Sequence, residues 1–318
     1  MRPPSVPFGP ETASIERSVP AGPGIRPWVT PPSTGWRATL GRVLATPGHL
    51  AASRDLILTA LGRELRLRMG GAILGPVWPL VQPLFLLAVY GLLFTALLGS
   101  KVPGAPTGGV ALGLFLFTGA LVWSALAEAV TRGTTSLVDG RELVKKLSFP
   151  AEVLPLVPNL ASLAQLFAAV VLFFLVGAVS GWAPWHAGML HLPLVLLLHA
   201  TLALGLSWGL AAMHVNLRDV GQALPLALTA LMFASPVFWI PSVEVLPSIG
   251  PWLPWLEASP FAHLLGAWRG VLLGGRPEEV LAPDPLAACR ALAPWSLAAL
   301  LIGRTMFARF EDRIADEV

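Results

Sequence analysis

The residues that could carry out chemistry in this chain are few and poorly matched to one another. The six histidines form no HExxH metal motif, no GxxxxGK[ST] phosphate-binding loop is present, and the single cysteine, Cys289, has no catalytic setting. Glu128 and Arg132 are four residues apart, a spacing that predicts a local ion pair on a helix. We expect His191 and His199 to be packed and hydrogen-bonded rather than functional. The sequence therefore predicts no catalytic site, and no metal or cofactor, in this chain.

One compact charged segment stands apart from the rest of the sequence. Residues 139–152, DGRELVKKLSFPAE, mix acidic and basic side chains between two long stretches that have almost none. In an apolar chain such a segment presents charge to water, and we expect it to contact a partner.

The composition indicates what this segment interrupts. Of the 318 residues, 55% are hydrophobic and 12% are charged, and the mean hydropathy is +0.70. In soluble domains about a quarter of the residues are charged. A single cysteine also excludes an intramolecular disulfide. The sequence predicts an all-α integral membrane protein.

Membrane spans follow from the uncharged stretches. A hydrocarbon core about 30 Å thick needs roughly 20 apolar residues as a helix, because lipid offers no partner to backbone polar groups. Six spans are predicted, at about residues 77–98, 110–131, 153–179, 187–213, 220–243 and 285–307. Arg290 and Arg304 lie near the ends of the last span, and we expect them to snorkel to the membrane surface.

The region between the fifth and sixth spans is apolar but irregular. Residues 245–275 contain four prolines and carry Glu257 and Arg269. Proline-broken backbone at membrane depth is acceptable only where protein or water covers it. We therefore predict short re-entrant helices there.

The N-terminal part divides into two segments. The first 35 residues contain nine prolines and no apolar run, and residues 1–52 are predicted to be a disordered cytoplasmic segment. Residues 53–72 are predicted to form an amphipathic helix lying in the membrane interface, with Arg63 and Arg66 on its polar face. This helix has two possible roles: anchoring the orientation, or contacting a lipid phosphate or a partner.

The distribution of Lys and Arg predicts the orientation. With the N-terminus inside, 17 of the 21 basic residues fall on the inner side and four on the outer side. Both termini, the charged segment and a second loop around Arg218 and Asp219 are then cytoplasmic. The segment 132–152 joins the second and third spans on that side.

Four segments of the sequence resemble the permease subunits of type-2 ABC transporters that export polysaccharides, such as O-antigen, capsule and teichoic-acid exporters. They are RDLILTALGRELRLRMGGAILGPVWPLVQPLFLLAVYGLLF, LVKKLSFPAEVLPL, NLRDVGQALPLALTALMFASPVFW and SPFAHLLGAWRGVLLG, in the family's order within residues 53–318. Ser259 and Gln82 replace the more usual asparagines before Pro260 and Pro83, and the long proline-rich N-terminus is not typical.

The resemblance implies an energy source on another chain. Such permeases form homodimers, two copies of an ATPase subunit bind ATP and Mg and dock beneath them, and the loop between the second and third spans is a coupling helix. The candidate coupling residues in this sequence are Glu142, Leu143, Lys145, Lys146, Phe149, Arg218 and Asp219. The alternatives are a merely solvated positive-inside loop for the first five, and a simple local pair for Arg218 and Asp219.

The resemblance also implies a substrate path lined by the first and fifth spans. Aromatic faces stack on the C–H patches of sugars, and the candidates are Trp78, Phe85, Tyr90, Phe94, Phe233, Phe238 and Trp239. Aromatic residues near span ends are also common interface anchors. Tyr90, the only tyrosine, lies near mid-span, where its hydroxyl needs a partner. Arg63, Arg66 and Arg68 are candidate contacts to the phosphate of a lipid carrier, or they attract anionic lipids in general.

The expected function is ATP-driven export of a lipid-linked polysaccharide across the cytoplasmic (inner) membrane, with membrane lipids but no nucleic acid as further partners. Two alternatives stay open. One is a type-2 ABC export permease for a drug or a lipid, and the other is an ion-coupled secondary transporter, which needs more ionisable residues inside its spans.

Overall fold

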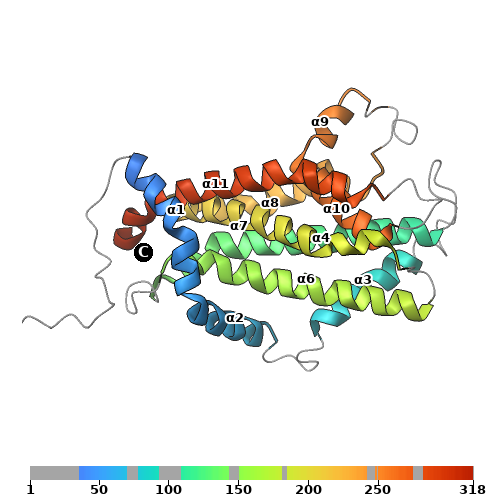
Figure 1. Ribbon diagram of the computed structural model, residues 1–318, viewed down its shortest axis with the longest axis horizontal. Helices are drawn as coiled ribbons and strands as arrows, with labels where there is room; N and C mark the ends of the chain where they lie inside the picture. The colour runs from blue at the N-terminus through green and yellow to red at the C-terminus, as the bar shows by residue number, and fades with distance from the viewer. Residues whose placement is uncertain are drawn as a thin grey trace, which may run out of the picture. The chain divides into compact units, whose positions relative to one another are not determined.

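In the residues that the computed structural model describes, helices are the only regular secondary structure, and turns join them (Figure 1). These residues are 36–69, 78–92, 109–142, 150–180, 185–241, 248, 250–274 and 282–317. A helix satisfies its backbone hydrogen bonds within one segment, which is what a chain in lipid requires. The all-α prediction is confirmed for this part of the chain.

Four helical segments of the described residues are long and apolar enough to cross a membrane. They are α4 (Gly109–Asp139), α6 (Val153–Ser180), the 3₁₀ turn η3 (Ala187–His191) continued by α7 (Leu192–Asn216), and α11 (Pro285–Glu317). α8 (Asp219–Ala234) is apolar but shorter. α3 (Trp78–Leu92) lies in the first predicted span, of which residues 77 and 93–98 are outside the described part. The chain is a multi-pass membrane protein.

Several boundaries differ from the predicted ones. α4 continues to Asp139 instead of ending near residue 131, so the predicted coupling segment begins as helix. α8 ends at Ala234, well before residue 243, because Pro236 and Pro241 lack the amide hydrogen that a helix needs and restrict the residues before them. In the predicted re-entrant region the chain forms two short helices, α9 (Leu253–Glu257) and α10 (Pro260–Leu273).

The prediction of disorder is wrong for residues 36–52, which form α1 (Trp36–Ala52). The first 35 residues lie outside the described part. α1 is held by tertiary contacts as well as by its own propensity: the Arg42 guanidinium donates a hydrogen bond to the Ala308 carbonyl of α11 (3.1 Å). After a turn at Ser53, α2 (Arg54–Met69) follows, within the predicted interfacial helix.

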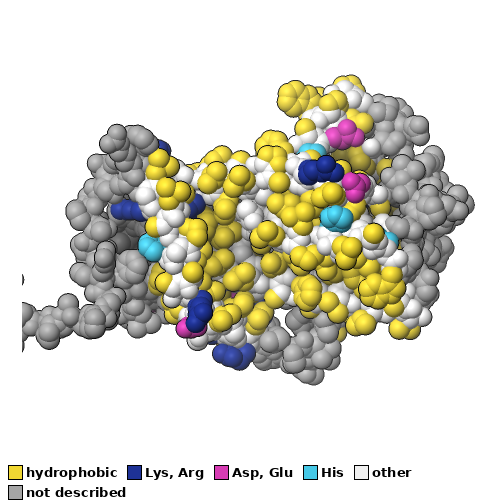
Figure 2. Space-filling view, in the orientation of Figure 1, with side chains coloured by type: hydrophobic (Ala, Val, Ile, Leu, Met, Phe, Trp, Pro, Cys, Tyr) yellow, Lys and Arg dark blue, Asp and Glu magenta, His cyan; other side chains and the backbone are white. Residues whose placement is uncertain are grey.

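α4 is the most deeply buried of the candidate spans. In its most apolar stretch, 72% of α4 is buried inside the protein, against 22% for α11. It packs against α3, α6, α7, α8 and α10. On the face that Figure 2 shows, hydrophobic side chains cover the middle of the bundle, and charged ones lie toward its two ends. An apolar belt between charged ends suits a protein surrounded by lipid.

Different helices lie at the two ends of the bundle (Figure 1). At the end called here the α1 end, α1 packs on the last part of α11, and α2 packs on α6. At the opposite end, called the α10 end, α10 packs on η3 and α11.

Among the helices that the structure describes, α7 and α11 make the most extensive contact, and glycines permit it. A Cβ atom added to Gly303 of α11 would lie 1.9 Å from the Gly205 carbonyl oxygen of α7. In lipid the hydrophobic effect does not bring helices together. Small residues then stabilise a helix contact, because they let the two backbones approach closely. The spacing of these two backbones therefore excludes any side chain at residue 303.

We expect Gly303→Ala to force α7 and α11 apart and to destabilise the protein by about 1–3 kcal/mol, the usual effect of overpacking. Thermal unfolding of the detergent-purified protein, followed by tryptophan fluorescence, measures this. Gly62→Ala on α2 is the control, since the nearest atom to its added Cβ is 3.7 Å away. Equal melting temperatures for the two variants would contradict the proposed crossing.

Candidate coupling and translocation site

The predicted coupling segment leaves the bundle at the α1 end. α4 ends at Asp139, Glu142 follows as an exposed residue, and the chain returns at Pro150. Four of the predicted coupling residues lie in residues 143–149, outside the described part: Leu143, Lys145, Lys146 and Phe149. The structure therefore shows where this segment begins and ends.

A buried ion pair fixes the point where the segment returns. A carboxylate oxygen of Glu152 lies 2.8 Å from Nη2 of Arg304 on α11. The two residues are only 4% and 3% exposed. The indole of Trp208 on α7 donates a hydrogen bond to the Glu152 backbone carbonyl (3.1 Å). The end of the predicted coupling segment is thereby joined to two long helices.

Aromatic side chains surround the buried guanidinium. Arg304 Cζ lies 5.5 Å from the ring centroid of Phe307 and 5.8 Å from that of Trp208. Such contacts stabilise a cation that is removed from water. Phe307 and Trp208 also belong to a small hydrophobic cluster with Leu137 and Leu154. The ion pair therefore lies under an apolar cover made by α4, α6, α7 and α11.

α1 closes the other side of the ion pair. Arg304 Nε donates a hydrogen bond to the Thr46 hydroxyl (2.6 Å). The His49 imidazole lies 3.6 Å from the Glu152 carboxylate. One residue pair thus connects the segment before α6, the end of α11 and the N-terminal helix.

The prediction that Arg304 snorkels to the surface is wrong. Its guanidinium turns inward because Glu152 offers a buried carboxylate there. Two signals in the sequence could have indicated this: Arg304 lies inside the predicted span 285–307, and Glu152 directly precedes a long uncharged run. Arg290 differs, being exposed, with its Nε donating to the Leu286 carbonyl of its own helix (3.4 Å).

A second ionic network attaches α2 to the bundle. Arg68 of α2 lies 3.0 Å from both Glu64 and Glu128, and Arg132 lies 3.3 Å from the same two carboxylates. The predicted Glu128–Arg132 pair is confirmed and is part of this larger set. Arg68 also donates hydrogen bonds to the Gln165 side chain and the Pro158 carbonyl of α6.

This network changes the interpretation of the three arginines of α2. The Arg68 side chain is only 6% exposed and its guanidinium is shared between two carboxylates. Arg63 and Arg66 are exposed. A phosphate approaching α2 from solvent therefore meets Arg63 and Arg66, whereas Arg68 has a positioning role between α2, α4 and α6.

Arg218 and Asp219 are exposed at the turn between α7 and α8. No ion pair joins these two side chains, within the part of the chain that the structure describes. The turn is instead closed by a hydrogen bond from the Gly221 amide to Nδ1 of His214 (3.2 Å). The turn follows the part of α7 that packs beside Leu154 and Phe307, so it lies at the α1 end.

The predicted path residues of the fifth span come together at the end of α8 and just after it. The ring centroids of Phe233 and Phe238 are 6.0 Å apart, and the Trp239 indole donates to the Phe233 carbonyl (3.0 Å). Phe233 and Trp239 line a cavity of about 420 Å³ together with Trp252 and Trp255. Those last two tryptophans were not among the predicted site residues, because they lie in the proline-broken region.

The predicted path residues of the first span are described less fully. Phe85 on α3 is 66% exposed. Trp78 and Tyr90 lie in α3, but their side chains are outside the described part, as is the whole of Phe94. α3 and α8 nevertheless line one cavity of about 560 Å³, whose lining includes Leu86 of α3, Leu228 and Met232 of α8, and Glu128 and Arg132 of α4.

The remaining sequence candidates are packed. His199 of α7 accepts a hydrogen bond at Nδ1 from the Trp268 indole of α10 (3.2 Å), which leaves the proton of its neutral ring on Nε2. Cys289 is a free, buried thiol. The expectation that His199 is packed and hydrogen-bonded is confirmed.

The fold and these contacts define a multi-pass, all-helical membrane protein with ionic connections at one end and an aromatic cavity at the end of α8. The family model of the ABC-2 type transporter matches residues 55–273, more than half of the chain. The chain belongs to this family, and it is the membrane component of a transporter. The resemblance to type-2 ABC permeases is thus confirmed.

Individual relatives agree with this assignment. The O-antigen export system permease protein RfbA of Myxococcus xanthus is 29% identical over 252 residues, which are 79% of this chain and 93% of that protein. Two O-antigen export system permease proteins RfbA of Klebsiella pneumoniae are 22% and 20% identical over 225 and 221 residues. Each of these two alignments covers 70% of this chain and 81% of the relative.

We expect Glu152→Ala to destabilise the protein by about 3–5 kcal/mol, because it leaves the Arg304 cation buried without its carboxylate. Thermal unfolding in detergent measures the loss. The control is Asp55→Ala, which removes an exposed pair with Arg54 and should leave the melting temperature nearly unchanged. If Glu152→Ala melted like the wild type, the ion pair would not be the anchor described above.

Proposed function

We propose that this chain is the permease of an ATP-driven exporter that moves a lipid-linked polysaccharide across the cytoplasmic membrane. The observation that carries the proposal is the similarity to an O-antigen export system permease along 93% of that relative's length. It is supported by the absence of a phosphate-binding loop in the sequence and by membership of a transporter family. The energy source is then an ATPase on a partner chain, where ATP and Mg bind.

The proposed assembly is a homodimer of the permease on two copies of the ATPase. Each permease has six spans, which are the four long ones together with α3 and α8. It also has an interfacial helix at residues 53–72 and the re-entrant helices α9 and α10. The excess of basic residues favours cytoplasmic termini. In that orientation the α1 end faces the ATPase.

In this proposal the segment 132–152 is the coupling element. Glu142 and the residues up to Phe149 contact the ATPase, and the turn of Arg218 and Asp219 gives a second contact. The buried pair of Glu152 and Arg304 supports this role physically, because force applied to the segment reaches α11 and α7 through a rigid connection and not through a loose loop.

The proposed substrate path lies between the two permease copies, along α3 and α8. Its aromatic candidates are Trp78, Phe85, Tyr90, Phe94, Phe233, Phe238 and Trp239. The common cavity of α3 and α8 and the grouping of Phe233 with Trp239 support this path. Flat aromatic faces make many weak contacts with sugar rings, which hold a polymer without stopping it.

The carrier lipid is proposed to enter beside α2. Arg63 and Arg66 are exposed and basic, and guanidinium groups pair well with phosphate oxygens. Arg68 stays in its network with Glu64 and Glu128. In this arrangement a phosphate bound at Arg66 would lie two residues along α2 from Arg68, the residue that connects α2 to α4.

The coupling role is tested by replacing Leu143, Lys145 and Phe149 together with alanine. We expect the complex with the ATPase to assemble, while export and the stimulation of ATP hydrolysis by the permease fall at least about tenfold, because the contact that transmits force is lost. Co-purification, ATPase assays and detection of polymer at the cell surface give the three readouts. The control replaces Arg54 and Asp55, exposed on α2. Normal export by the triple variant would refute the coupling role.

The path is tested with Tyr90→Ala and Tyr90→Phe. If Tyr90 contacts the sugar chain, the alanine variant should export several-fold less polymer at unchanged assembly and unchanged basal ATP hydrolysis, and the phenylalanine variant should recover most of the loss, since it retains the stacking face. Wild-type export by Tyr90→Ala would remove this residue from the path.

A further inference from the structure

Arg269 is a buried cation at the α10 end, and no carboxylate neutralises it within the described residues. It lies on α10 and is 3% exposed. Its Cζ is 3.4 Å from the ring centroid of Phe115 on α4. Nη2 donates to the backbone carbonyls of Val237 (3.1 Å) and Phe115 (3.4 Å), and the buried Nε has no hydrogen-bond partner. Burial of a charge that no opposite charge neutralises is unfavourable unless something pairs with it.

The surrounding backbone is shaped to hold this guanidinium in place. A Cβ added to Gly119 of α4 would lie 2.7 Å from Arg269 Nη2 and equally close to the Val237 carbonyl oxygen. Only a glycine leaves room for both groups. Since α4, α10 and the segment after α8 all contribute to the position of Arg269, the arginine is pre-organised and not a mobile surface side chain.

Arg269 borders a cavity of about 420 Å³, within the range of about 300–1,000 Å³ usual for small-molecule sites. The walls come from α9, α10, the start of α11 and the segment after α8. Most of them are apolar, including Pro236, Ile240 and Ala291. The other titratable side chains on the lining are His263, Glu257 and Asp284. The site thus has one fixed cation, two carboxylates and an imidazole.

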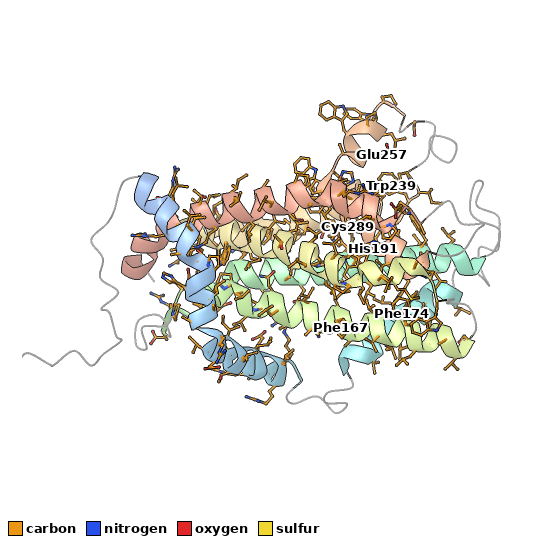
Figure 3. The ribbon with its side chains drawn as sticks, viewed as in Figure 1. Phe167, Phe174, His191, Trp239, Glu257 and Cys289 are labelled. Carbon is orange, nitrogen blue, oxygen red and sulfur yellow. The ribbon has the colours of Figure 1, made fainter. Side chains whose placement is uncertain are left out.

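The two carboxylates do not pair with Arg269. Asp284 caps α11, and its oxygens accept hydrogen bonds from the amides of Leu286 (3.3 Å) and Ala287 (3.1 Å). Glu257 is exposed on α9, and Figure 3 shows it near Trp239 at the α10 end. Carboxylates in such positions accept hydrogen bonds from hydroxyl groups. They also repel a ligand that carries several negative charges.

We propose that this cavity binds a polyol that carries a single anionic group, a phosphodiester or a carboxylate. The anion pairs with the guanidinium of Arg269, which forms charge-assisted hydrogen bonds with either group. Hydroxyls of the same ligand donate to Glu257 and Asp284. Two sources have this chemistry: the glycerophosphate headgroup of an anionic lipid, and a uronic-acid unit of an exported polymer. The second source, unlike the first, rests on the proposed function.

The test is ligand-dependent thermal stabilisation of the full-length protein purified in a neutral detergent. A ligand that binds only the folded state raises the melting temperature in a saturable way. The four probes are a short-chain phosphatidylglycerol, the matching phosphatidylcholine, glucuronate and glucose. We expect phosphatidylglycerol or glucuronate to stabilise the wild type, and the two controls to give no shift. Which of the two acts distinguishes the lipid from the acidic sugar.

Two variants connect the effect to this cavity. Arg269→Gln should weaken the binding of the effective probe about tenfold or more, the usual loss for a hydrogen bond to a charged group. Ala291→Phe keeps Arg269 but fills the cavity, so it should also abolish the shift, which covers the case that Arg269→Gln fails to fold. Arg290→Gln, at an exposed arginine nearby on α11, should bind like the wild type.

The proposal is overturned if neither anionic probe stabilises the wild type, or if the shift persists in Ala291→Phe. It is also overturned if Arg290→Gln abolishes the shift as Arg269→Gln does. Because this measurement involves neither ATP nor transport, its outcome is independent of whether the chain exports a polysaccharide.

Discussion

The architecture of the α1 end depends on the buried ion pair between Glu152 and Arg304. Two charges removed from water need each other and further polar partners, and here those partners come from α1, through Thr46 and His49. Trp208 adds a hydrogen bond to the Glu152 backbone from α7. α1, the segment at Glu152 and the last part of α11 are far apart in the sequence and are thereby held at one point. These contacts hold α1 against the bundle, although a proline-rich stretch precedes it.

The same constraint explains which features the sequence could predict. Long uncharged runs predict α6 and α7 closely, because lipid requires an uninterrupted helix and a charge inside it is costly. The end of α8 and the inward turn of Arg304 were not predictable in this way. Pro236 limits α8 locally, and Arg304 turns inward only because Glu152, from a distant segment, is there to receive it. The spacing of Glu128 and Arg132 predicted their ion pair, but Glu64 and Arg68 joined them through tertiary packing.

The kind of site could be predicted from the sequence, but only some of its residues could. The resemblance to type-2 ABC permeases correctly identified the family, and the aromatic residues at the end of α8 and just after it do lie together. Trp252 and Trp255 were missed because their segment has no regular pattern. Arg269 appeared to be an isolated charge in an irregular region, and its burial against Phe115 follows from the close approach that Gly119 permits. The two ends of the bundle therefore use buried arginines differently, one paired within the chain and one bordering a cavity.

In the proposed function, this permease and a separate ATPase together move a lipid-linked polysaccharide. The most direct measurement uses proteoliposomes that contain the permease, its ATPase and a lipid-linked O-antigen-type polymer, with the ATPase facing outward. On addition of ATP and Mg, the polymer should become protected from an added glycosidase, and omission of either protein should prevent this. Unchanged digestion of the polymer while ATP is hydrolysed would refute the proposed export function.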